Sequence, residues 1–319
     1  MGMSIGFGLS PTVSRFAGGG GGGVTPEFGV ALASGASIKT STDALFTYLV
    51  GWIKDRANAA SHQLYDSVRG TGLILEPDDA TVEQAYSAPA GSSLGWAWEL
   101  SSTGGANTDG SINTTVALSP SDAVAAILHN GSGANATLGH GMSGTPEMYF
   151  TKTRDSADWW AGYHKDLTDA SYYIRLDSTQ KETQKAIIWN STAPDASVIS
   201  VGTDTTTNAS GDDFLTLAFR SISGILKVGS YTGNTTTEPS ITGLGATGRA
   251  VLIIRIDDTG NRVMIDSDRG DEYVYANSTS TEGSAAYVDW TADGFDVAPG
   301  VTNSDINANG GTYIYLLMA

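Results

Sequence analysis

The sequence contains no cysteine among its 319 residues. This absence excludes disulfide bonds, thiolate metal sites and cysteine nucleophiles, so stability has to come from packing and assembly. Basic residues are also scarce, with 17 lysines and arginines against 34 acidic residues and a net charge of −17, and they do not cluster. Because phosphate binding needs clustered lysine and arginine, nucleic acid is not an expected partner.

Long hydrophobic runs are missing as well, and none approaches the roughly eighteen residues needed to cross a bilayer, so membrane insertion is not expected. What the sequence does contain is 40% hydrophobic residues, enough for genuine cores. It also has 40 glycines and abundant threonine, serine, asparagine and aspartate, the residues that form turns. This composition predicts an all-β fold.

The sequence repeats itself at a period of about one hundred residues. Residues 64–70 and 264–270 share the pattern Asp-Ser-x-Arg-Gly, and residues 208–211 resemble residues 307–310. Aligned without gaps, the three copies bring together Trp52, Phe150 and Leu252, and also Asp66, His164 and Asp266. Such repetition is typical of a multiplied scaffold or binding surface, because a catalytic site is rarely needed three times.

The pattern of strands and turns divides the chain into tandem antiparallel β-sandwich modules of the jelly-roll or lectin-like kind. Apolar runs such as Phe214 to Arg220 and Tyr313 to Met318 predict buried strands, whereas Ser121 to Ile127 and Ser178 to Ala186 predict short helices. The expected boundaries are an extended glycine-rich segment at 1–40, an abbreviated β unit at 41–112, and full β-sandwich modules at 113–222 and 223–319.

The N-terminal segment contains six consecutive glycines at residues 18–23, which behave as a flexible tether in a free chain. We expect the segment to anchor the protein in a larger assembly, and the alternative is a terminus held by neighbouring subunits. The candidate anchoring side chains are apolar: Ile5, Phe7, Leu9 and Phe16.

Two further groups of residues are candidates for binding. Asp266, Asp268 and Asp271 bunch in one turn and could supply oxygen ligands to calcium, although solvated turns explain the bunching equally well. Four aromatic residues of the second module are candidate contacts with a protein interface or a glycan: Trp159, Trp160, Tyr172 and Tyr173. His164 stands where the other copies have aspartate, and it is expected to cap the same turn structurally. No catalytic residue and no resident cofactor is expected.

An ordered series of motifs resembles a known family. The series comprises the stretches at residues 109–112, 130–133, 139–141, 152–156, 160–164, 189–194, 229–234 and 307–313. Over residues 45–319 the chain is similar to repetitive, Gly/Thr/Ser-rich proteins encoded by tailed phages, many of them marine, that are described as virion structural or tail-fibre-like. The resemblance implies β-sandwich modules in virion appendages, and it carries no set of catalytic residues.

These observations lead to the expectation of a phage virion structural protein that resembles a tail fibre or appendage. Its N-terminus would be held by other virion proteins and its modules would contact the host surface, with a host glycan as the candidate receptor. Repeated binding sites would add avidity, and a symmetric homo-oligomer, first of all a trimer, is expected. The alternatives are a purely architectural capsid or tail decoration protein, and a glycan-degrading tail enzyme.

Overall fold

The structure, a computed structural model, describes residues 12–15 and 27–319. Strands make up 42% and helices 5% of it, and the strands form several antiparallel sheets, so the predicted all-β, sandwich-like fold is confirmed. The candidate anchoring residues Ile5, Phe7, Leu9 and Phe16 lie outside the described residues. Among the described residues, no helix is long and apolar enough to span a membrane.

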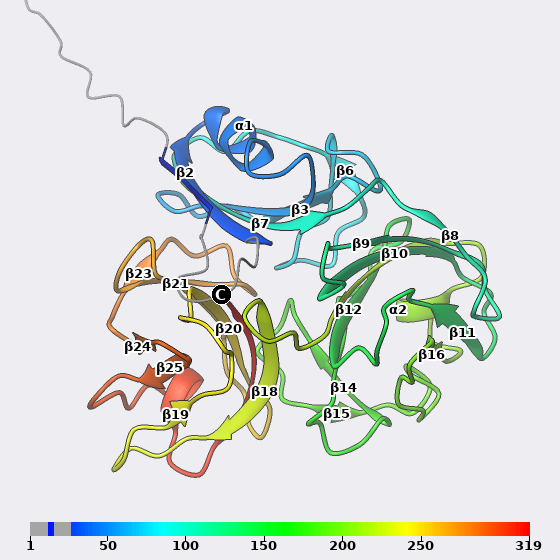
Figure 1. The fold of residues 1–319 in the computed structure, drawn as a ribbon. Coiled ribbons are helices and arrows are strands. Elements are labelled where there is room, and N and C mark those ends of the chain that lie inside the picture. Colours follow the sequence, from blue (N-terminus) through cyan, green and yellow to red (C-terminus); the bar gives the residue numbers. More distant parts are fainter. Residues whose placement is uncertain (1–11, 16–26) are drawn as a thin grey trace, which may run out of the picture.

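Three units lie around a common centre (Figure 1). Unit 1 is formed by residues 12–15 and 27–103, unit 2 by residues 104–221, and unit 3 by residues 222–319. Each unit is built on one main antiparallel sheet whose inner face turns toward the other two units. The modules therefore form a ring, and they are not strung out in a line as a tandem array would be.

Unit 1 has a main sheet and a small hairpin, with helix α1 (Ser37–Asp43) on its outer side. The strands of the main sheet, in spatial order, are β1 (Thr12–Arg15), β2 (Phe28–Ser34), β7 (Ser92–Leu100), β3 (Tyr48–Asp55) and β4 (Gln63–Asp66). The hairpin pairs β5 (Leu73–Ile74) with β6 (Gln84–Ala85).

Unit 2 has the broadest sheet. Its strands, in spatial order, are β15 (Thr183–Gln184), β14 (Tyr172–Arg175), β13 (Ala161–His164), β12 (Met148–Thr153), β17 (Asp213–Phe219), β10 (Val124–Asn130), β9 (Thr114–Leu118) and β8 (Gly105–Asn107). Its outer layer contains β11 (Ala136–Gly139), β16 (Val198–Val201) and helix α2 (Thr205–Asn208).

Unit 3 repeats this plan. The strands of its main sheet are β18 (Leu226–Thr232), β26 (Thr312–Met318), β20 (Ala250–Arg255), β21 (Arg262–Asp266), β22 (Glu272–Tyr275) and β23 (Gly283–Ser284). The outer layer contains β19 (Ser240–Ile241), β25 (Gly294–Val297), β24 (Val288–Thr291) and helix α3 (Ser304–Asn307).

Strand pairing confirms the register predicted from the repeat. Val50, Met148 and Ala250 occupy equivalent positions in the three sheets. Their partners on the neighbouring strand are the aligned residues Asp66, His164 and Asp266, respectively. Two strand positions later come Trp52, Phe150 and Leu252, which lie opposite Trp96, Leu217 and Leu316 respectively. The three sheets are therefore structural copies related by an approximate threefold axis.

One hydrophobic core is shared by all three units. The inner faces of the sheets meet at the axis and leave a cavity of only about 20 Å³, consistent with close packing. Its lining comes from all three sheets: Trp52, Trp98, Phe150, Leu217, Phe219, Leu252, Met264, Leu316 and Met318. The outer face of each sheet packs on a separate, smaller core of its own unit, which gives the sandwich-like layering.

The predicted unit boundaries need correction. Strand β2 is part of the first sheet and helix α1 packs against that sheet, so the extended segment does not reach residue 40. Phe28 and Val30 of β2 are buried in the common core, and this burial fixes β2 in place. Strand β8 precedes the expected boundary at residue 112 but pairs with β9 of unit 2.

Unit 1 is shorter than the other two units, because the described chain between β4 and β7 holds only the β5–β6 hairpin, without counterparts of β16 and α2. Helix α1 covers the outer face of its sheet instead.

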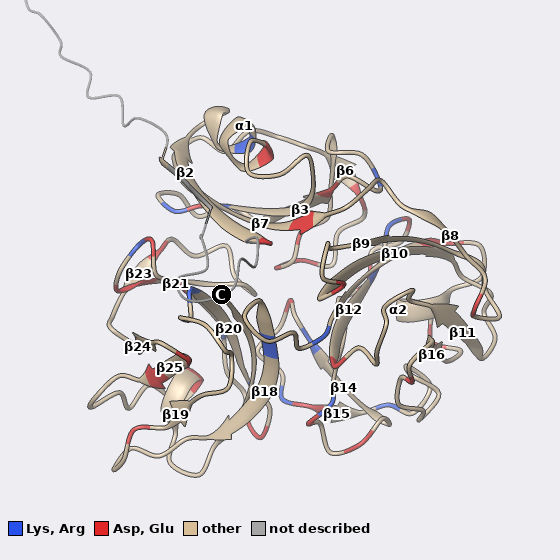
Figure 2. Ribbon diagram, viewed as in Figure 1, with Lys and Arg blue, Asp and Glu red and all other residues tan. Residues whose placement is uncertain are grey.

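Charged residues are scattered over all three units in the view of Figure 2, and basic segments do not gather in one region of it.

Candidate functional site: the junctions between the units

Each junction is joined by a backbone hydrogen bond from an equivalent glutamate. The amide of this glutamate donates to a carbonyl at the end of a strand in the next unit around the ring. The three pairs are Glu83 with Arg154 at 2.8 Å, Glu182 with Ile256 at 3.0 Å, and Glu282 with Arg56 at 3.1 Å. The third bond joins unit 3 back to unit 1, so the ring is closed.

A second set of equivalent contacts crosses each junction. A side-chain N–H of one unit reaches a carbonyl of the preceding unit in all three cases: His62 to Tyr275 at 3.0 Å, Trp160 to Glu76 at 2.8 Å, and Arg262 to Arg175 at 2.9 Å. Because the Nδ1 of His62 accepts from the indole of Trp52, its Nε2 carries the proton that is donated. These buried contacts satisfy backbone groups that the ring would otherwise leave without partners.

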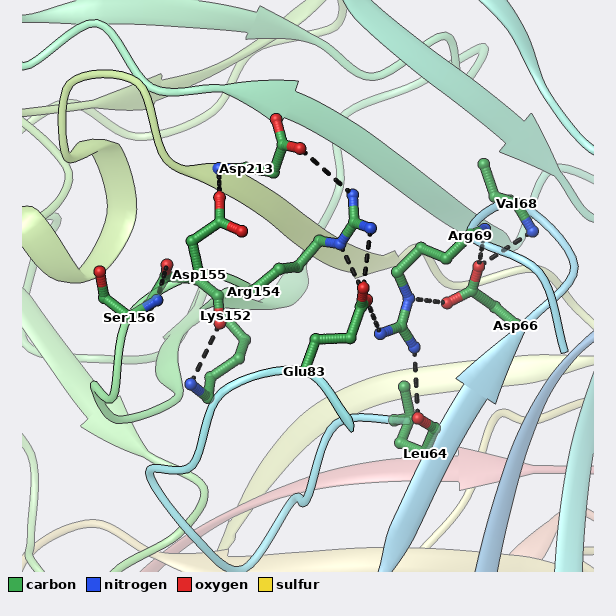
Figure 3. A network of polar contacts seen from close by, with 11 residues as sticks. Leu64, Asp66, Val68, Arg69, Glu83, Lys152, Arg154, Asp155, Ser156 and Asp213 are labelled. Atoms are coloured by element: carbon green, nitrogen blue, oxygen red, sulfur yellow. Dashed lines mark hydrogen bonds and ion pairs between the residues drawn. The ribbon is translucent and has the colours of Figure 1, made fainter. Parts of the chain in front are cut away.

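The junction between units 1 and 2 also contains an ion network, shown in Figure 3. The carboxylate of Glu83 accepts hydrogen bonds from Nε and Nη2 of Arg154 at 2.8 and 2.9 Å, and from Nη1 of Arg69 at 2.8 Å. The side chain of Arg69 is fully buried and also binds Asp66. Burial alone would raise the pKa of Glu83, but hydrogen bonds and charges from Arg154 and Arg69 outweigh burial and hold that pKa below its usual value.

The junction between units 3 and 1 repeats the contacts of this glutamate with its two arginines. The carboxylate of Glu282 accepts hydrogen bonds from Nε and Nη2 of Arg56 at 2.8 and 2.7 Å, and from Nη1 of Arg269 at 2.5 Å. Asp266 binds Arg269 and accepts a hydrogen bond from the indole of Trp96 across the junction at 3.0 Å. Two of the three junctions are therefore locked by a carboxylate held between two guanidinium groups.

The junction between units 2 and 3 has neither arginine. Leu167 stands at the position of Arg69 and Arg269, and Ile256 at the position of Arg56 and Arg154. Glu182 instead accepts from the amide and hydroxyl of Thr168 at 2.9 and 2.6 Å. A cavity of about 420 Å³ opens beside it, so this junction differs from its two counterparts in shape as well as in charge.

The candidate calcium ligands are not brought together as a metal site. Asp266 is fully buried and its carboxylate is engaged by Arg269 and Trp96, whereas Asp271 is exposed. In the part of the chain that the structure describes, no three histidine or acidic side chains lie close enough to hold a metal ion.

The candidate aromatic contacts fall into three different environments. Trp160 is fully buried at the junction with unit 1, so the prediction that it contacts a glycan or another protein is wrong. Tyr173 is also buried and stacks on the half-buried Trp159 at 4.8 Å, and Arg175 and Lys185 lie over the Trp159 ring. Tyr172 is half-buried and lines the cavity at the junction between units 2 and 3.

The four histidines are all in the interior of their units. Each is buried, and burial lowers the pKa of His62 and His164 to about 3 and that of His129 to about 4. The Nδ1 of His164 accepts from the amide of Asp166 at 3.0 Å, as Asp66 accepts from Val68 at 2.9 Å. This confirms the predicted turn-capping role of His164.

Sequence reasoning missed the junction glutamates and arginines. A signal was present, since the gapless alignment that matches Trp52 with Phe150 also matches Arg56 with Arg154, four residues on. Charged residues at equivalent turn positions are ordinarily solvated, however, and only the closed ring turns these toward one another.

The fold and its junctions define a class: a single-chain ring of three β units with an approximate threefold axis and a shared core. The chain belongs to the family described as "Domain of unknown function (DUF7483)", which matches residues 86–319, from just before β7 to the last residue. No curated protein and no solved structure matches the chain.

Proposed function

We propose that this protein is a structural component of a phage virion, a tail-fibre-like or appendage protein that contributes to host attachment. The motif series described above supports the phage origin. The observation that carries the structural role is the closed ring: three units share one core, and the junctions between them are tied by buried polar contacts. Such a ring is a rigid head on which surface loops can be displayed.

We propose further that the protein is not an enzyme. A general acid or base works best with a pKa near the operating pH and within reach of a substrate. The four histidines are buried, their pKa values are lowered, and at least one ring nitrogen of each binds a backbone group or another side chain. The histidines thus serve packing and turn formation, which favours display over catalysis.

In this proposal the N-terminal segment is held by other virion proteins, and exposed loops meet the host surface, with a glycan as the receptor class. A homo-oligomer, first of all a trimer, remains part of the proposal. Because one chain already supplies three equivalent units, a single copy on a threefold appendage also fits the geometry. Light scattering of the purified protein separates these cases, since one copy has a mass of 33.0 kDa and a trimer has three times that mass.

Labelling of intact particles tests the proposal. Antibodies against residues 27–319 would be applied to particles of the phage that encodes the chain and located by electron microscopy. Label at the end of the tail or on fibres supports the appendage. Label spread over the capsid or along the tail tube favours the architectural alternative, and particles that lack the protein by mass spectrometry overturn a virion role.

A further inference from the structure

The cavity between units 2 and 3 is placed where the other two junctions hold arginine. Its lining includes Thr168, Tyr172, Lys181, Glu182, Ile256 and Asp257. Ile256 aligns with Arg56 and Arg154, and the backbone contact that fixes this alignment is present at all three junctions. The cavity is thus lined by the equivalents of the glutamate and the arginine that pair at the other two junctions.

The two filled junctions show how that space binds a guanidinium. Arg154 and Arg56 each present Nε and Nη2 to the two oxygens of the glutamate, in the planar paired geometry that guanidinium and carboxylate favour. Both side chains are mostly sheltered, with 19% and 24% of their surface exposed. The repeated geometry indicates a property of the junction rather than an accident of one loop.

Glu182 retains the capacity to accept such a group. Each of its oxygens receives one hydrogen bond from Thr168, and a carboxylate has about four acceptor positions. No guanidinium or ammonium group forms an ion pair with Glu182 among the described residues. The half-buried Tyr172 borders the same cavity, and aromatic side chains are common partners of guanidinium groups.

Other charges around the cavity limit its affinity. Asp257 adds a second carboxylate, but it is already bound by Arg255 at 3.0 Å. Lys181 is exposed and borders the cavity, where its charge opposes a second cation. Millimolar rather than nanomolar binding of a small cation is therefore expected.

We propose that this cavity is a binding site for a guanidinium group, supplied by an arginine side chain of a partner polypeptide. The guanidinium pairs with Glu182 as Arg154 pairs with Glu83, and its alkyl stem lies along Tyr172. The inference rests on the geometry of the ring and does not depend on the proposed virion role.

Titration of the full chain with N-acetyl-arginine amide tests the proposal, followed by NMR or calorimetry. N-acetyl-citrulline amide, which has the same shape without the charge, is the matched ligand control. The arginine probe is expected to bind at least about tenfold more tightly than the citrulline probe. Equal binding of the two, or no binding of either, overturns the proposal.

Two variants assign the site. Glu182→Gln is expected to weaken binding of the arginine probe by at least about tenfold, whereas Glu238→Gln, at an exposed glutamate outside the cavity, leaves it unchanged. Ile256→Arg restores the arginine of the other junctions, fills the cavity from within and is expected to abolish binding. Unchanged affinity in Glu182→Gln overturns the proposal, and this variant keeps the test decisive if Ile256→Arg does not fold.

Discussion

One glutamate occupies the same place in each junction, and its partners determine how much it contributes to stability. Glu83 and Glu282 each form ion pairs with two sheltered guanidinium groups, whereas the hydrogen bonds to the carboxylate of Glu182 come from Thr168. Removing one member of a buried ionic network leaves the remaining charges uncompensated, and this costs more than the loss of a surface ion pair.

We therefore predict that Glu83→Gln lowers the free energy of unfolding by about 2 kcal/mol, while the matched Glu182→Gln lowers it by less than about 1 kcal/mol. Arg69 keeps its bond to Asp66 in the variant, which limits the loss. Urea denaturation of the three proteins measures the difference. Equal losses in the two variants would show that the arginines do not depend on Glu83.

Asp78 is a buried residue whose negative charge is disfavoured by its surroundings. Burial raises its pKa to about 7 against the attraction of Lys54, and the nearby charge of Glu76 adds to the shift. Its Oδ1 accepts from the amide of His62 at 2.8 Å, and in unit 3 the equivalent acceptor is a neutral amide, Asn277, at 2.9 Å.

Asp78→Asn is predicted to change the pH dependence of stability. Between about pH 4 and pH 7 the unfolded chain has lost this proton while the folded chain keeps it, so the wild-type protein loses stability as the pH rises. The variant lacks this loss. Its unfolding free energy relative to that of the wild-type protein should therefore rise by about 1–3 kcal/mol between pH 4 and pH 8. Urea midpoints at the two pH values measure the shift, and a constant difference would place the pKa of Asp78 in its ordinary range.

For single residues, the sequence allows a role to be predicted only where the repeat aligns a residue with equivalent residues of the other copies. The role of His164 was predictable because Asp66 and Asp266 occupy its position. The burial of Trp160 was not, since its partner carbonyl belongs to Glu76, 84 residues away in a different unit.

Among the elements, strand β2 has the largest consequence for how the chain can be divided. It pairs along its whole length with β7, the strand that also carries Trp96 and Trp98 into the common core. A chain that begins at residue 41, the predicted start of the first unit, lacks β2 and leaves this edge of β7 open.

We predict that a chain beginning at residue 27 folds, whereas a chain beginning at residue 41 is destabilised by more than about 4 kcal/mol or is insoluble. The loss follows from removing Phe28 and Val30 from the core. Thermal denaturation and solubility of the two truncated proteins compare them with the full chain. A stable chain from residue 41 would mean that β2 is dispensable.

Most long strands were predictable, and the short helices were not. The apolar runs at β17 and β26 have the composition of strands buried on both faces, and both strands formed there. The helix expected at Ser121 to Ile127 is wrong because β10 begins at Val124 and pairs with β9 and β17 on its two sides. Pairing with distant strands thus overrides an alanine-rich local sequence. The helix expected at Ser178 to Ala186 is also wrong, since β15 lies within that stretch.

For the whole molecule, the shared core makes the three units mutually dependent. Each sheet buries its inner face only when the other two are in place, as Trp98, Phe219 and Met318 meet at the axis. The repeat predicted three copies but not the ring, because the contacts that close it join residues far apart in the sequence, such as Arg56 and Glu282, which are 226 positions apart.

Unfolding is therefore predicted to occur in one transition for the three units. The calorimetric and van't Hoff enthalpies should agree, and tryptophan fluorescence should give the same midpoint as circular dichroism. Fluorescence is a useful probe here because six of the seven tryptophans belong to units 1 and 2, and only Trp290 belongs to unit 3. Separate midpoints would show that the units fold independently.

The covalent linkage of the three units also affects how the protein can evolve. In a homotrimer one substitution appears at all three interfaces at once, so a change that weakens an interface is multiplied by three. Here the codon for Ile256 is read once per ring, and the arginines at the other two junctions continue to hold it closed. A gene that carries its own triplication can therefore give up one interface to a new contact while inheriting the stability of the other two.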